Sequence, residues 1–129
     1  MHSGNYSGAE QYYHKAISLS PLDPNSTTYK NGLFFANLGQ GNFDVALNYN
    51  DECRLQFPNV GTYKGFNAAT LGHLNRDGEA KIALKEYLAL RPNLKKKSDY
   101  KKIFVPNSTL ADILIEGLVK ASWQPEDEE

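Results

Sequence analysis

Apolar residues recur at helical spacing in successive segments of this chain, and glycine, asparagine or proline interrupts the pattern between them. The pattern predicts helices over residues 7–20, 28–40, 43–57, 61–74 and 77–91. A short amphipathic helix is expected over 95–103, and a last helix follows Pro106. Because the connections are only a few residues long, neighbouring helices are expected to be antiparallel. No segment shows a convincing strand pattern, so the predicted class is all-α.

Three of these segments end on a proline that an alanine precedes by twelve residues. The pairs are Ala9 with Pro21, Ala46 with Pro58, and Ala80 with Pro92. The steps between the prolines are 37 and 34 residues, which is typical of stacked helical repeats. We expect small residues at the places where the two helices of a repeat cross, and a larger side chain there would cost roughly 1–3 kcal/mol. The predicted repeat-packing residues are Ala9, Ala16, Ala46, Cys53 and Ala80.

A short element marks the start of the second helix in each repeat. It reads Gly4-Asn-Tyr-Ser-Gly-Ala9, then Gly41-Asn-Phe-Asp-Val-Ala46, and in degenerate form Asn75-Arg-Asp-Gly-Glu-Ala80. These elements resemble tetratricopeptide repeats over about residues 4–92. The resemblance implies a right-handed superhelix of antiparallel helix pairs with C-terminal capping helices. The position of the small residue late in the second helix holds Ala16, Cys53 and Tyr87 in turn. The departures from the family pattern are Phe34, where glycine is usual, Lys30 and Lys64, where an aromatic residue is usual, and Asn67, which replaces a leucine of the first helix.

The resemblance also implies an organisation along the chain. Residues 1–92 are expected to hold the repeats, with the first repeat truncated to its second helix. Residues 93–123 are expected to form the capping helices, and residues 124–129 an acidic tail. Because the first repeat starts midway, we expect the chain to be the C-terminal piece of a longer protein.

The C-terminal part has a second resemblance, carried by Arg91-Pro-Asn-Leu94, Pro106 and Ile115-Glu-Gly-Leu-Val-Lys-Ala121. It is similar to the C-terminal end of tetratricopeptide regions in bacterial proteins that carry an adenylate or guanylate cyclase domain or a winged-helix regulator domain. The resemblance implies a bacterial, cytoplasmic regulatory module whose parent is an adenylate cyclase or a transcriptional regulator. No part of a cyclase active site lies in this chain.

In tetratricopeptide proteins the first helices of the repeats line a concave groove that holds a peptide or a helix. The family's groove offsets, carried over, fall on Thr28, Asn31, Phe35, Leu38, Thr62, Gly65, Phe66, Ala69 and His73. Phe35 and Phe66 are the expected apolar anchors, and Asn31 and His73 are expected to set polarity and register. Only Asn31 would suit a carboxylate clamp, so that mode of binding is rejected. Two alternatives stay open: an open groove, or a groove that the C-terminal helices fill.

The predicted function is therefore protein–protein interaction as a scaffold, through a peptide or helix bound in the groove. A second hypothesis is self-association that regulates the upstream domain. The first helix has lost its partner, so its apolar side chains would be exposed and would favour a homodimer. These side chains are Tyr12, Tyr13, Ala16 and Ile17.

Composition narrows the choice of partners and compartments. The length of 129 residues is that of one domain, and the hydrophobic content of 40% is typical of a soluble protein. Its net charge of −1 gives no global field that would draw nucleic acid or an anionic membrane. One cysteine excludes an internal disulfide and fits a reducing compartment. No apolar run approaches the roughly 20 residues of a membrane span, and the N-terminus lacks signal-peptide features. The expected location is cytoplasmic.

The residue types of catalytic and metal sites are scattered in this sequence. Cys53 lies at a position that requires a small buried residue, and no histidine supports it. His14 and His73 are far apart, and Glu79 and Glu86 belong to predicted solvated helix faces. A basic patch interleaved with Tyr100 consists of Lys95–Lys97, Lys101 and Lys102. It is interpreted as a solvated helix face, and contact with nucleic acid or acidic lipid is the alternative. We therefore expect no catalytic residue, no metal and no cofactor, and hence no enzyme.

Overall fold

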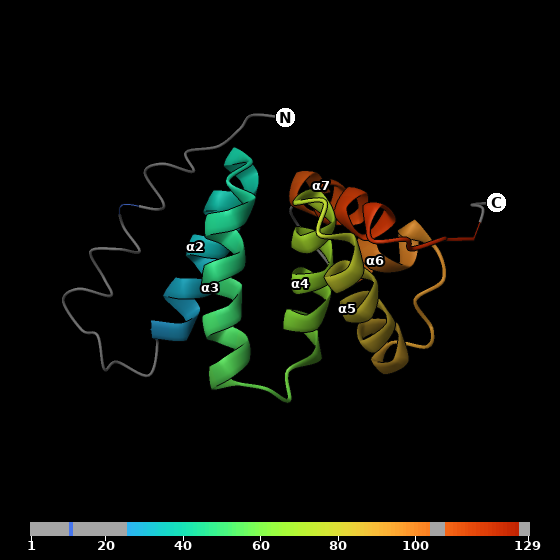
Figure 1. Ribbon diagram of the computed structural model, residues 1–129, viewed down its shortest axis with the longest axis horizontal. Coiled ribbons are helices and arrows are strands. Elements are labelled where there is room, and N and C mark those ends of the chain that lie inside the picture. Colours follow the sequence, from blue (N-terminus) through green and yellow to red (C-terminus); the bar gives the residue numbers. More distant parts are fainter. Residues whose placement is uncertain (1–10, 12–25, 104–107, 127–129) are drawn as a thin grey trace. The chain divides into compact units, whose positions relative to one another are not determined.

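The structure is a computed structural model that describes Gln11 and residues 26–103 and 108–126 (Figure 1). Its helices are α2 (Ser26–Gln40), α3 (Phe43–Gln56), α4 (Gly61–His73), α5 (Asp77–Leu90), α6 (Lys97–Ile103) and α7 (Ser108–Lys120). Each agrees closely with a helix predicted from the sequence, and no strand occurs among the described residues, so the all-α class is confirmed. The helix predicted over residues 7–20 falls, apart from Gln11, outside the described residues.

The contacts divide the chain into two compact units, Met1–Val60 and Gly61–Glu129. In the first unit α2 packs on α3. In the second unit α4 packs on both α5 and α7, and α6 packs on α7 (Figure 1). The last predicted repeat and the C-terminal helices thus share one core. Assembly of the helix pairs into a superhelix stays a prediction.

The turns after α2 and α4 have the same geometry, 34 residues apart. Gly41 and Asn75 both adopt left-handed backbone angles, with φ of 80° and 59°. The N–H groups of the next residues, Asn42 and Arg76, donate to the carbonyls five residues earlier at 2.9 and 3.1 Å. Asparagine tolerates this conformation better than most residues with a side chain. The third copy of the sequence element therefore forms the same turn as the second, although it begins with Asn75 instead of glycine.

The small residues predicted at the helix crossings are buried. Ala46, Cys53 and Ala80 each have 0% of their surface exposed, while Ala9 and Ala16 lie outside the described residues. Tyr87, at the position equivalent to Cys53, is also buried, with 3% exposed. Its ring packs over Gly65, where an added Cβ would lie only 2.6 Å from Tyr87 Cζ.

The tyrosine is thus accommodated by a glycine on the facing helix. In the preceding repeat, 34 positions earlier, Asn31 and Cys53 take the places of Gly65 and Tyr87. In the earlier repeat the larger residue of the pair lies on the first helix, and in the later repeat it lies on the second. A close-packed contact tolerates such an exchange when a change in one side chain is compensated by its neighbour. The glycine on the facing helix explains how a tyrosine fits at position 87.

Candidate functional site

The predicted groove positions on α2 divide into core and surface. Leu38 is fully buried, with 0% exposed, so it belongs to the core of its unit and not to a groove surface. Asn31 and Phe35 are partly exposed, one helical turn apart. The ring of Phe35 meets that of buried Phe34 edge-on, with centroids 5.2 Å apart. The side chain of Thr28 lies outside what the structure describes.

Asn31 has an unusual hydrogen-bonding state. Its Oδ1 atom is buried and has no hydrogen-bond partner among the described residues. A buried acceptor without a partner costs about 1–3 kcal/mol. The α2 face, which we define as Asn31 and Phe35, thus combines a partly exposed aromatic ring with an unsatisfied polar atom. This combination suits a bound peptide, which offers N–H donors and apolar side chains.

The predicted groove positions on α4 are mostly enclosed. Phe66 and Ala69 have 3% and 0% of their surface exposed, so both are core residues. Gly65 lies beneath the ring of Tyr87. Thr62 is partly exposed, and its hydroxyl accepts a hydrogen bond of 3.4 Å from the guanidinium of Arg91. Phe66 is therefore not available as a surface anchor in this structure.

Helix α7 covers the side of α4 that carries Ala69. The two helices meet at Gly72 and Gly117, where their backbones are in direct contact. A Cβ added at Gly117 would overlap the carbonyl of Ala69, and one added at Gly72 would overlap the carbonyl of Gly117. Helix α7 therefore lies on the side of α4 that carries Ala69, one of the predicted groove positions.

His73 forms a second contact between α4 and α7, through a hydrogen bond. Its Nε2–H group donates to the carbonyl of Ile113 at 2.6 Å. Burial lowers the pKa of His73 below its ordinary value of 6.5, the bond to Ile113 opposes this, and Lys120 and Glu116 of α7 add smaller effects of opposite sign. The folded chain thus favours the neutral imidazole, which holds α7 in place rather than contacting a ligand.

Acidification below pH 6.5 is expected to weaken the docking of α7. Because the pKa of His73 is lower in the folded than in the unfolded chain, the unfolded chain takes up the proton first, and stability falls with pH in this range. Urea unfolding followed through Trp123, the single tryptophan, should show this loss between neutral pH and about pH 5.5. A His73→Gln variant, which keeps a donor but does not titrate, should lose less. Equal losses in both proteins would contradict the prediction.

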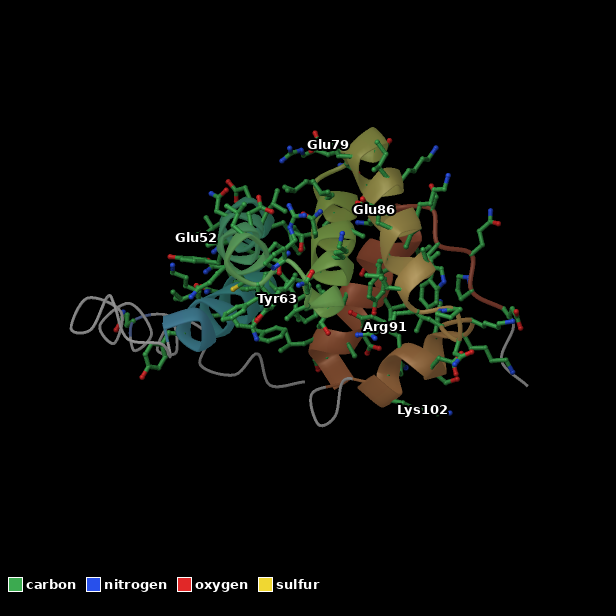
Figure 2. All side chains as sticks on the ribbon, turned by 90° about the horizontal axis from the view of Figure 1, so that it is seen from below. Glu52, Tyr63, Glu79, Glu86, Arg91 and Lys102 are labelled. Carbon is green, nitrogen blue, oxygen red and sulfur yellow. The ribbon has the colours of Figure 1, made fainter. Side chains whose placement is uncertain are left out.

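The other residues with chemical potential are inert or solvated. Cys53 is fully buried, and this burial raises its thiol pKa to about 11, so the nucleophilic thiolate is disfavoured. Glu79 and Glu86 project from the outer side of α5 (Figure 2), and Glu79 pairs with Arg76 at 2.6 Å. Within the described part of the chain, no three or more histidine, cysteine or carboxylate groups converge on a metal position.

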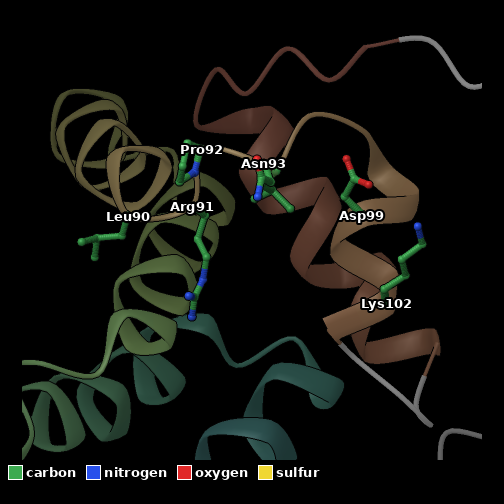
Figure 3. Close-up of a pocket in the computed structure, with 7 residues that line it drawn as sticks. Leu90, Arg91, Pro92, Asn93, Asp99 and Lys102 are labelled. Atoms are coloured by element: carbon green, nitrogen blue, oxygen red, sulfur yellow. The ribbon is translucent and has the colours of Figure 1, made fainter.

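One pocket of about 360 Å³ lies between the α5–α6 connection and α6 (Figure 3). We call it the α5–α6 pocket, lined by Leu90, Arg91, Pro92, Asn93, Leu94, Asp99 and Lys102. Asp99 Oδ2 shapes it by accepting the backbone N–H groups of Lys95 and Lys96 at 3.0 and 2.8 Å. No sequence pattern predicts this pocket, because nothing in the residue spacing indicates that the connection folds back on α6.

Comparisons with known proteins add no further constraint. None of the helices in the described part of the chain has the length and apolar content that a bilayer span requires. No protein-family model, no curated protein and no solved structure matches the chain.

Proposed function

We propose that this chain is a protein–protein interaction module that binds a peptide or helix and performs no chemistry of its own. The observation that carries the proposal is the buried, unpartnered Oδ1 atom of Asn31 beside the partly exposed ring of Phe35. An apolar side chain of a bound peptide would cover the ring, and rotation of the Asn31 amide toward the surface would let a backbone N–H of the peptide satisfy the acceptor. The proposed binding surface is the α2 face, because α7 already covers part of α4.

The resemblances of the sequence extend this proposal. A tetratricopeptide stack would place the α2 face on its concave side, where the family holds its ligands. The parent would be a bacterial cytoplasmic regulator with a cyclase or winged-helix domain. The apolar side chains proposed for self-association, in residues 6–20, lie outside the described residues.

The proposal predicts which substitutions abolish peptide binding. Peptides selected from a phage-displayed library on the intact chain should bind Phe35→Ala at least about tenfold more weakly, because truncating an aromatic anchor typically costs 2 kcal/mol or more. Asn31→Ala should also weaken them, through loss of the acceptor. Fluorescence polarisation with labelled peptides measures both effects.

The matched control is Ile82→Ala on α5, where an exposed apolar side chain away from the α2 face is removed. This variant should bind the selected peptides as the unchanged chain does, and circular dichroism should show all three variants folded. Selected peptides that bind Phe35→Ala and Asn31→Ala with unchanged affinity would refute the α2 face as the binding surface.

A further inference from the structure

The charged residues that line the α5–α6 pocket are Arg91, Lys102 and Asp99, so positive charge exceeds negative charge even though Lys102 attracts the Asp99 carboxylate. Asp99 is the only acidic residue that lines it, and its carboxylate is engaged by two backbone N–H groups, which lower its pKa. Lys102 forms no ion pair with the described residues. Arg91 has a buried Nε without a hydrogen-bond partner, and its guanidinium hydrogen-bonds the side chains of Tyr87 and, through Nη2 at 3.4 Å, Thr62, so no carboxylate of the described residues compensates its charge. Two cationic side chains thus border one pocket, from opposite sides (Figure 3).

The surface around the pocket is also basic. Residues 95–102 contain five lysines and one aspartate. Of these lysines, only Lys101 forms an ion pair in the described structure, with Asp112 at 3.5 Å. The local field therefore favours an anionic partner, although the whole chain has a net charge of −1.

The shape and composition of the pocket favour an acidic protein segment over other polyanions. Tyr100, the aromatic residue among these lysines, is 1% exposed, so it offers no ring on which a nucleobase could stack. The pocket is concave and has apolar walls, including Leu90, which is 50% exposed. A concave site with a cation beside an apolar wall accepts one carboxylate and one apolar side chain.

We propose that the α5–α6 pocket binds an acidic peptide segment of a partner protein. A carboxylate of the segment lies between Arg91 and Lys102, and a neighbouring apolar side chain packs on Leu90 and Pro92. Charge-assisted hydrogen bonds to the carboxylate supply orientation, and the lysines of residues 95–102 accelerate the encounter. The pocket shares no residue with the α2 face, and this proposal does not depend on the function proposed for that face.

A short fluorescein-labelled peptide in which aspartate and glutamate flank leucine tests the proposal on the intact chain. Fluorescence polarisation should show saturable binding that weakens as the salt concentration rises. The same peptide with asparagine and glutamine in place of the acids should not compete. Lys102→Gln should weaken binding about tenfold, as expected for loss of one hydrogen bond to a charged group.

Two control variants separate the pocket from general charge and from the α2 face. Lys85→Gln on α5 removes the same charge from an exposed position outside the pocket lining and should leave binding unchanged. Phe35→Ala should also leave it unchanged, so failure of either proposal is visible without the other. The pocket proposal is overturned if the amide peptide competes equally or if Lys85→Gln weakens binding as much as Lys102→Gln. It is also overturned if anionic vesicles or single-stranded DNA bind and the acidic peptide does not.

Discussion

Replacement of Gly117 by alanine is expected to lower the free energy of unfolding of the Gly61–Glu129 unit by about 3 kcal/mol. The new methyl group would overlap the backbone carbonyl of Ala69, and it would also lie 2.7 Å from Cδ2 of His73. A backbone carbonyl inside a helix cannot rotate away, so α7 has to move off α4. The greater helix propensity of alanine, worth about 1 kcal/mol, offsets only part of this cost.

Urea unfolding followed through Trp123 measures the effect directly. Trp123 is 5% exposed just beyond α7, and it is the only tryptophan, so its emission reports whether this end of the chain is packed. Gly78→Ala is the matched control, because an added Cβ there has nothing within 4 Å. That variant should be unchanged or slightly more stable. Equal midpoints for the two variants would show that the glycine contact between α4 and α7 is not a constraint.

Phe34→Ala is expected to destabilise the Met1–Val60 unit by about 3–5 kcal/mol. Phe34 is 0% exposed and is among the largest fully buried side chains of the described residues. Its removal deletes apolar contacts and leaves a cavity that the α2–α3 pair has few other side chains to fill. The helical signal in circular dichroism should therefore fall at lower urea than in the unchanged chain.

Leu55→Ala provides the comparison for this variant. Leu55 is a large apolar residue in the same unit, but 82% of its surface is exposed, so its truncation should change stability by less than about 0.5 kcal/mol. An unfolding curve for Phe34→Ala that coincides with that of Leu55→Ala would mean that α2 and α3 do not form a packed core.

The helices were predictable from the sequence because their boundaries depend on local signals. Gly41 and Asn75 adopt the left-handed turn that ends α2 and α4, and Pro58 and Pro92 lie just beyond α3 and α5. The burial of Ala46 was predictable for a related reason, since a small residue at a fixed repeat position indicates a close crossing. Such information lies within a few residues of the feature that it determines.

The surface was less predictable, because exposure depends on distant parts of the chain. The family offsets placed Leu38, Phe66 and Ala69 in a groove, and the structure buries all three. Ala69 lies at the contact with Gly117, 48 residues later, and no spacing pattern around either residue reveals this pairing. Which residues can meet a partner was therefore not a local property of the sequence.

The joining of α4 to α7 has a consequence for the order in which the chain becomes folded during synthesis. Helices α2 and α3 are neighbours in sequence, so they can pack against each other soon after Gln56 has emerged from the ribosome. The surface of α4 around Gly72, in contrast, cannot be covered by α7 until Gly117 has been synthesised. A ribosome that stalls in α6 would leave this apolar surface open to chaperones and proteases.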